Sequence, residues 1–213
     1  MAGETVVKVS WGPRPESHQE LAGRWLDLLG RLTELSAGAL ADWRWDGHGT
    51  APGEPVPRDA GAFVVARQPD GGYAQLKATA GGSNRFSPFI AVVLLFPGTP
   101  DSAVPLADRL PEALAAMAGV WDADTGSTYD RELFTALRTA YDLRPSHPRC
   151  GWSVFLSANR AARVPTDLAA RRLEAGSGGV VLDIGTTTDA VLAAHGTLAE
   201  AGALEPAPTP WAI

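Results

Sequence analysis

The side chains best suited to chemistry are carboxylates in the middle of the chain. They are Asp122, Asp124, Asp130 and Glu132. Acidic residues at such short spacing are typical of calcium loops, but an EF-hand loop also requires glycine at its sixth position and a bidentate glutamate at its twelfth. Counted from Asp122, those positions hold Ser127 and Leu133. The spacing therefore argues against a calcium site.

The same region concentrates the negative charge of the chain. From Asp101 to Asp142 there are eight acidic residues and three arginines, a net of −5 (3 − 8), against a formal charge of −6 for all 213 residues. Acidic residues are common at helix starts, where they interact with the helix dipole, so a solvated helix face is one interpretation. The other is an acidic surface that meets a basic partner. The residues alone leave both open.

A second candidate is the segment Asp183–Thr188, which reads Asp-Ile-Gly-Thr-Thr-Thr after an apolar stretch. As an isolated motif it allows a phosphate-binding loop at the end of a strand, and a nucleotide-binding protein or enzyme would use it in that way. The segment resembles the first phosphate loop of the sugar-kinase, actin and Hsp70 superfamily. In that superfamily a long chain follows the loop and supplies a second lobe, whereas only 25 residues follow Thr188 here (213 − 188). We therefore expect a strand end followed by a helix cap, a position that Asp and Thr favour.

No arrangement for nucleophilic catalysis is recognisable in the sequence. The segment Gly151–Phe155 lacks the second glycine of a Gly-x-Ser-x-Gly turn. His147 and Cys150 are three residues apart, but Pro148 between them favours a loop over a shared helix face. The four histidines include no i, i+4 pair of the kind that binds zinc on a helix. We expect a protein that is not an enzyme and that uses no cofactor and no metal.

Composition and charge favour a soluble, cytoplasmic protein. A formal charge of −6 does not suit a nucleic-acid surface, which needs clustered Lys and Arg. A single cysteine excludes an internal disulfide. The first residues lack the basic and apolar regions of a signal peptide, and the longest apolar run, Phe89–Phe96, is too short to cross a membrane. We expect neither a membrane nor a nucleic-acid partner.

Hydrophobic periodicity predicts an α+β protein, with one domain over residues 1–204 that has a mainly antiparallel sheet and flanking helices. Strands are predicted over 5–11, 63–66, 73–79, 89–96, 152–156, 171–175 and 180–184. Helices are predicted over 17–40, 105–120, 130–141 and 190–201. The uninterrupted apolar run 89–96 indicates a central strand covered on both faces. Residues 46–61 are typical of a surface loop, and the proline-rich residues 205–213 of a mobile tail.

The first predicted helix has a distinctive entry and exit. Ser10-Trp11-Gly12-Pro13-Arg14-Pro15-Glu16-Ser17 precedes it, and Ser17 with Glu20 forms a capping-box pattern. After the helix come Trp43 and Trp45, and in an extended segment such alternation points one indole inward and the other outward. Trp45 could therefore anchor a partner, as tryptophan often does at interfaces, or it could pack in the core.

Several of these blocks, taken in order, resemble the family of bacterial immunity proteins called immunity protein 52. The matching blocks are Trp11-Gly12-Pro13-Arg14-x-Glu16-Ser17 with its leucine-rich helix, the Trp43 region, Trp121-Asp122-x-Asp124-x-Gly126, Arg149–Ser157 and Arg171–Gly176. The resemblance implies a small α+β protein encoded beside a toxin that typically carries a restriction-endonuclease-like nuclease domain. It implies that the protein binds and neutralises this toxin in the producing cell and has no catalytic residues of its own.

The sequence therefore predicts an immunity protein that inhibits a cognate toxin, basic and nuclease-like, by stoichiometric complex formation. An acidic inhibitor would be steered quickly onto a basic nuclease, either to plug its cleft or to dock elsewhere. The candidate partner contacts are Trp45, Trp121, Asp122, Asp124, Asp130 and Glu132. The alternatives are a small nucleotide-binding protein or enzyme that uses Asp183–Thr188, and an adaptor domain without a toxin partner.

Overall fold

The computed structural model describes residues 4–45, 62–80, 88–99, 101–176 and 178–207, without the side chains at 45, 62 and 63. Nine strands of this described part form one sheet in the order β2-β3-β4-β5-β1-β6-β7-β9-β8, and every neighbouring pair is antiparallel. The strands are β1 (Thr5–Trp11), β2 (Arg44–Trp45), β3 (Ala62–Arg67), β4 (Tyr73–Thr79), β5 (Phe89–Phe96), β6 (Thr125–Asp130), β7 (Ser153–Leu156), β8 (Arg171–Ala175) and β9 (Gly179–Asp183). The helices are α1 (His18–Leu35), the 3-10 helix η1 (Ala107–Arg109), α2 (Leu110–Trp121), α3 (Arg131–Tyr141), α4 (Ala158–Ala161) and α5 (Thr188–Glu200). The predicted α+β class with a mainly antiparallel sheet is confirmed.

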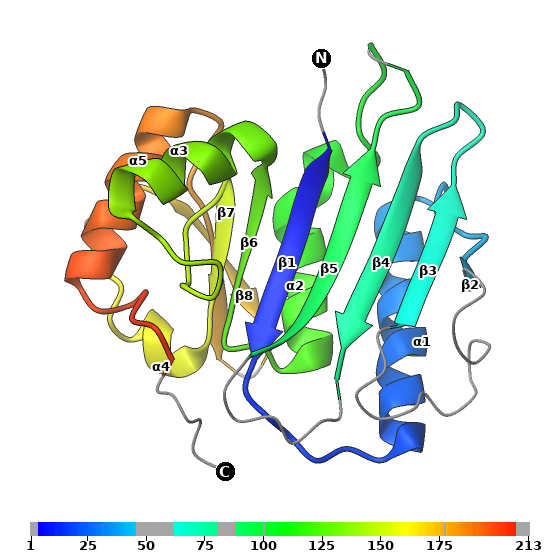
Figure 1. Cartoon of the computed structure of the whole chain (residues 1–213), viewed down its shortest axis with the longest axis horizontal. Coiled ribbons are helices and arrows are strands. Elements are labelled where there is room, and N and C mark those ends of the chain that lie inside the picture. Colours follow the sequence, from blue (N-terminus) through cyan, green and yellow to red (C-terminus); the bar gives the residue numbers. More distant parts are fainter. Residues whose placement is uncertain (1–3, 46–61, 81–87, 100, 177, 208–213) are drawn as a thin grey trace.

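Helices cover the two faces of this sheet unevenly (Figure 1). α1 and α2 lie behind the sheet, while α3 and α5 lie in front of the part formed by β6, β7, β9 and β8. No described helix lies in front of β1, β5, β4 and β3. The described helices therefore cover both faces at one end of the sheet and only one face at the other.

The larger core lies between the sheet and the helices α1 and α2. The tryptophans Trp11, Trp25 and Trp121 are its largest members, and alternate residues of the strands, such as Val93, complete it. The buried residues of α1 recur at three- and four-residue spacing, so one stripe of the helix faces the sheet. The predicted capping box starts this helix, with Ser17 Oγ accepting from the Glu20 N–H at 3.2 Å.

A second core fills the space between the sheet and the helices α3 and α5. Leu133 and Leu137 of α3 pack there with Val191 and Leu198 of α5. Cys150 lies in this core without exposed surface, and burial raises the pKa of its thiol. A thiol that stays protonated is a poor nucleophile, so Cys150 serves the packing of this core.

The apolar run 89–96 forms β5, which is central but covered by described helices on one face only. Alternate residues from Phe89 to Leu95 are buried toward α1 and α2. The residues between them are only partly buried: Ile90, Val92, Leu94 and Phe96. The described elements therefore cover only one of the two faces that were predicted to be covered, and the continuous run reflects an apolar row on the other face.

Two helices differ from the prediction at their ends. α1 stops at Leu35 because the chain then turns through Ala37 and Gly38, which both have positive φ. The second helix begins at Leu110, after η1, where Pro111 occupies a position in the first turn that suits proline.

Two predicted segments fall outside the described residues, the loop 46–61 completely and the tail 205–213 from residue 208 onward. The first residue of the predicted tail is held in place. Glu205 accepts a hydrogen bond at its carboxylate from Arg163 Nη1 at 2.7 Å and another at its carbonyl from Arg160 Nη1 at 2.8 Å. The chain is therefore anchored beside α4 at this residue.

His195 of α5 is a buried histidine whose charge state is coupled to folding. It is 2 % exposed, and its Nδ1 accepts a hydrogen bond from the backbone N–H of Cys150 at 3.3 Å. The pKa of His195 is lowered to about 4, from an ordinary value near 6.5. Burial is the larger cause, and the positive charge of Arg149 is the smaller one. As the pH falls below about 6.5 the unfolded chain takes up a proton at this position, whereas the folded chain stays neutral until about pH 4.

We therefore expect the contribution of His195 to stability to be complete above about pH 6.5 and to be lost between about pH 6.5 and 4. The free energy of unfolding should fall by on the order of 2 kcal/mol from pH 7 to pH 5. Urea unfolding at both pH values measures this loss. The variant His195→Asn keeps an acceptor for the Cys150 N–H but does not titrate, so it should lose distinctly less. An equal loss in the variant would assign the pH dependence to other groups.

Candidate functional site

The entry segment of α1 is tied to the end of α2. Arg14 Nη2 donates to the Trp121 carbonyl at 2.9 Å, and Arg24 Nη1 donates to the Val120 carbonyl. α2 has no basic residue in its own last turn, so these arginines supply the positive charge that a helix C-terminus favours. The buried Glu16 bridges them, with its Oε1 at 3.1 Å from Arg14 Nε and 2.6 Å from Arg24 Nε. The distinctive entry segment therefore has a structural role.

Two of the four predicted contact carboxylates form ion pairs within the chain. Asp122 Oδ2 lies 3.3 Å from Arg14 Nη1 and 3.1 Å from Arg24 Nη2. Asp124 Oδ2 lies 2.8 Å from Arg160 Nη2, and Asp124 Oδ1 accepts a hydrogen bond from the Ser157 hydroxyl at 3.1 Å. These pairs leave little unbalanced negative charge at this end of β6 to attract a basic partner.

The other two carboxylates lie at the opposite end of β6. Asp130 caps α3 by accepting from the Leu133 N–H at 2.8 Å, and Glu132 is exposed in the first turn of that helix. About 20 Å of extended strand separates Asp124 from Asp130. The structure therefore does not bring the four carboxylates together into one acidic surface.

The two tryptophan candidates differ in their surroundings. Trp121 is 0 % exposed and stacks on Trp11, with ring centroids 4.9 Å apart. It is a core residue that a partner cannot reach in this structure. Trp45 lies on the edge strand β2, and its side chain is outside the described part of the chain. Its neighbour Trp43 packs against the larger core and donates from Nε1 to Thr33 Oγ1 at 3.1 Å.

The segment Asp183–Thr188 forms a strand end followed by a helix cap. Asp183 closes β9 and lies 3.2 Å from Arg171 Nη2. Thr187 caps α5 by accepting from the Ala190 N–H at 3.4 Å. Both side chains therefore serve the fold itself.

The described residues lack two kinds of feature, a metal-binding cluster and a membrane-spanning helix. They contain no group of three or more His, Cys, Asp or Glu side chains that could hold a metal ion. None of their helices combines the length and the apolar character needed to cross a membrane.

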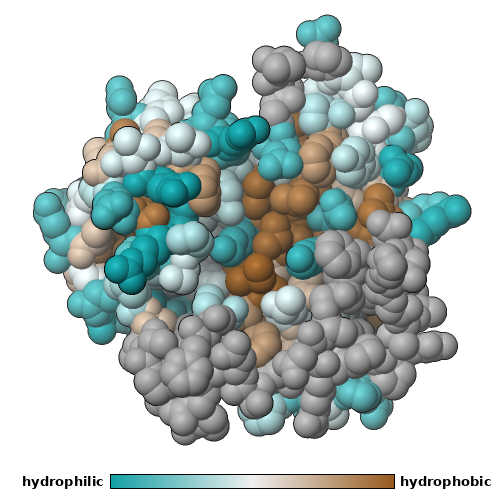
Figure 2. Space-filling view, viewed as in Figure 1, coloured by the Kyte–Doolittle hydropathy of each residue, from teal (hydrophilic) through white to brown (hydrophobic). Residues whose placement is uncertain are grey.

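The side of the sheet that no described helix covers has an apolar centre. Figure 2 shows apolar side chains gathered on this side of the molecule, over the middle strands. We call this surface the open face. It consists of Ile90, Val92, Leu94 and Phe96 of β5 with their cross-strand neighbours Val6, Lys8, Ser10, Tyr73, Gln75, Lys77 and Thr79. Tyr73 stacks on Phe96 with ring centroids 4.4 Å apart, which extends the apolar surface onto β4.

The charged residues of the open face are both cations. The chain has only two lysines among its 18 basic residues, and both lie on this face. In the antiparallel register, Lys77 of β4 and Lys8 of β1 flank Val92 of β5, about 10 Å apart across two strand spacings. No aspartate or glutamate occupies a position of the open face, although the whole chain carries a formal charge of −6. The open face is therefore opposite in charge to the molecule as a whole.

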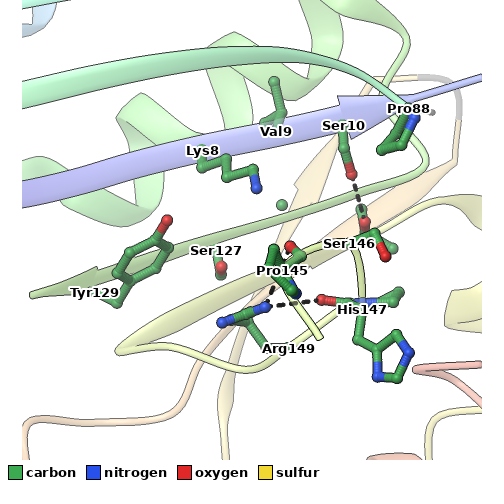
Figure 3. Close-up of a pocket in the computed structure, with 13 residues that line it drawn as sticks. Lys8, Val9, Ser10, Pro88, Ser127, Tyr129, Pro145, Ser146, His147 and Arg149 are labelled. Atoms are coloured by element: carbon green, nitrogen blue, oxygen red, sulfur yellow. Dashed lines mark hydrogen bonds between the residues drawn. The ribbon is translucent and has the colours of Figure 1, made fainter. Parts of the chain in front are cut away.

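A small hollow adjoins the open face, between β1, β6 and the segment that precedes β7 (Figure 3). Its volume is about 60 Å³, and its lining includes Lys8, Ser127, Tyr129 and Arg149. In Figure 3 the Lys8 ammonium and the Arg149 guanidinium approach the same space from opposite sides, with the hydroxyl groups of Ser127 and Tyr129 beside it. The hollow thus combines two cationic groups with two hydroxyl groups.

Arg149 is 7 % exposed and is fixed by its surroundings. Its Nη2 donates to the Arg144 carbonyl at 2.8 Å, and its guanidinium carbon lies 4.5 Å from the centroid of the Phe134 ring. Its Nη1 is buried and has no hydrogen-bond acceptor among the described residues. The pKa of Lys8 is lowered, mainly by burial and to a smaller extent by the positive charge of Arg149. Within the described part of the chain, neither cation has a carboxylate partner.

The sequence does not predict the hollow, because β6 carries no recognisable strand pattern. Its residues, Thr-Gly-Ser-Thr-Tyr-Asp, are mostly polar and lack the apolar alternation that marks β1 and β4. The usable signal is the period-two spacing of Thr125, Ser127 and Tyr129, which all line the hollow. A second signal is Lys8, a single charged residue among the valines of β1.

Fold and surface together define an α+β protein in which one sheet face, apolar and cationic, is covered by no described helix. The solved structure of the Pseudomonas aeruginosa T6SS protein PA0821 is similar to this chain, with a TM-score of 0.55 at 11 % sequence identity. The similarity covers 95 % of this chain and 77 % of that protein, and at this identity it shows a shared fold. No family model and no curated protein sequence matches the chain.

Proposed function

We propose that this protein is an immunity protein, not an enzyme, that neutralises a cognate toxin by forming a stoichiometric complex with it in the cytoplasm. The observation that carries the proposal is the open face. Its apolar row leaves surface in water that a protein partner would cover, at about 25 cal/mol for each Å² of apolar area buried. An apolar centre that includes an aromatic pair, with charged residues toward its edges, is the usual anatomy of a protein interface.

Two further observations support a toxin as the partner. The ordered motifs of the sequence resemble the immunity protein 52 family, whose members neutralise toxins that typically carry a nuclease domain. The fold is like that of a T6SS protein, which is compatible with a secretion-system setting. We propose a nuclease-like toxin on the strength of the first of these observations.

The open face favours a different mode of toxin binding from the one that the acidic segment indicates. Asp122 and Asp124 are already paired with arginines, so they are poorly placed to plug a basic cleft. A cationic and apolar face instead fits a toxin surface that is apolar and carries acidic side chains. A basic nuclease can offer such groups, because metal-dependent nucleases hold their divalent ions with carboxylates.

Co-expression with the product of the adjacent gene tests this proposal. We expect that product to arrest bacterial growth when expressed alone, and this chain to restore growth and to co-purify with it at a fixed ratio. Growth arrest that persists when both proteins are produced would contradict the immunity role. Restored growth without any isolable complex would contradict neutralisation by stoichiometric binding.

A further inference from the structure

We infer that the hollow between Lys8 and Arg149 is a binding site for a carboxylate group, supplied by an acidic side chain of the protein that covers the open face. The identification of that protein as the toxin rests on the proposed function. The site itself is formed by residues of this chain, and it can be tested without the toxin.

The chemistry of the lining groups points to an anionic occupant. Lys8 presents an ammonium and Arg149 presents a buried Nη1 without an acceptor among the described residues. Ammonium and guanidinium groups only donate hydrogen bonds, so whatever fills the space between them must accept. Ser127 and Tyr129 add hydroxyl groups that can donate to the same occupant. A carboxylate satisfies these donors with charge-assisted hydrogen bonds, the stronger kind.

The two cations that line the hollow repel each other. Burial and the charge of Arg149 lower the pKa of Lys8, which shows that the ammonium is disfavoured at this position. A buried guanidinium N–H without an acceptor is also unfavourable for the folded chain. A bound carboxylate would remove both penalties, so the hollow suits an anion.

The position of the hollow favours a carboxylate on a protein over a free ion. Val92, Lys8 and Ser127 are neighbours in one cross-strand row, so the hollow begins where the apolar row ends. If an acidic side chain of the partner entered the hollow, the apolar residues beside it on the partner would pack against β5. The volume of about 60 Å³ suits a small planar group of this kind.

Lysine NMR tests the site directly, because the chain has only two lysines. With carbon-13 at the lysine Cε, each side chain gives its own signal, and the variant Lys77→Met assigns the pair. We expect acetate, added at constant ionic strength, to shift the Lys8 signal and to raise the pKa of Lys8, while Lys77 serves as the internal control. A response to inorganic phosphate but not to acetate would overturn the carboxylate assignment. No response, or an equal response at both lysines, would overturn the site.

Toxin binding tests the partner. Lys8→Met removes the ammonium but keeps most of the apolar side chain, and we expect it to weaken the complex roughly 30-fold or more. The control is Arg131→Met, which removes an exposed cation of α3 outside the open face and should change the affinity less than about threefold. Thermal unfolding of both variants checks that they fold. If Lys8→Met binds the toxin as tightly as the unmodified chain, this inference is overturned and the proposed function is not. If the unmodified chain binds no toxin, the proposed function is overturned, but the acetate result is unaffected.

Discussion

Replacing Val92 by glutamate is expected to weaken the complex with the toxin roughly 100-fold or more, a loss of about 2.8 kcal/mol of binding free energy. Val92 lies at the centre of the open face, between Lys8 and Lys77 in the cross-strand row. In the complex the new carboxylate would be buried in the apolar part of the interface and would repel the acidic side chain that we place in the hollow. In the free chain it would lie between two lysines, so the fold should tolerate it.

Isothermal titration calorimetry with the toxin measures this effect. The matched control is Leu26→Glu, because Leu26 is 47 % exposed on α1, which lies behind the sheet and away from the open face (Figure 1). The same exchange there should leave the affinity within about threefold of the native value. If Val92→Glu binds as tightly as the native chain, the toxin does not use the open face.

Replacing Trp121 by alanine is expected to lower the free energy of unfolding by about 3–5 kcal/mol. Its fully buried indole stacks on Trp11 of β1 and meets Trp25 of α1 edge-on, with centroid distances of 4.9 and 6.1 Å. Alanine would leave a cavity where β1, α1 and α2 meet, and close packing of large rings allows little collapse around it. Single domains have a total stability of about 5–15 kcal/mol, so this variant should be close to unfolding.

Urea unfolding, monitored by fluorescence, measures the stability of this variant. A second variant, Trp121→Phe, distinguishes an effect on stability from an effect on toxin binding. Phenylalanine refills most of the space, so this second variant should fold with reduced stability and bind the toxin as the native chain does. A Trp121→Ala chain that keeps its stability but loses the toxin would instead make Trp121 a partner contact, as first predicted from the sequence.

The elements that could be predicted from the sequence are those with a local signal. Ser17 and Glu20 are three residues apart, so the capping box that starts α1 is visible in the sequence alone. β4 shows alternating burial along its length, which matches its pattern of apolar and polar residues. β6 has no such apolar pattern, and it is held as a strand by its ladders with β1 and β7. A polar central strand of this kind depends on its neighbours more than on its own residues.

The acidic surface predicted from the sequence is not formed, because two of its carboxylates pair with arginines that are distant in the sequence. Asp122 is 108 positions from Arg14, and Asp124 is 36 positions from Arg160. Counting charge along the segment therefore indicated an acidic surface where the fold makes ion pairs. The hollow shows the opposite case, since Lys8 near one end of the chain meets Arg149 from the other side of the fold. Surface charge depends on which residues the fold brings together, so the summed charge of one segment does not predict it.

Methyl NMR of the native chain in the complex shows directly whether the toxin covers the open face. With isoleucine, leucine and valine methyl groups labelled in this chain only, saturation transferred from the toxin identifies the methyl groups that it contacts. We predict transfer to Ile90, Val92 and Leu94, and none to Leu26 on the far side of the sheet. Transfer to Leu26 with the methyl groups of β5 unaffected would contradict the account.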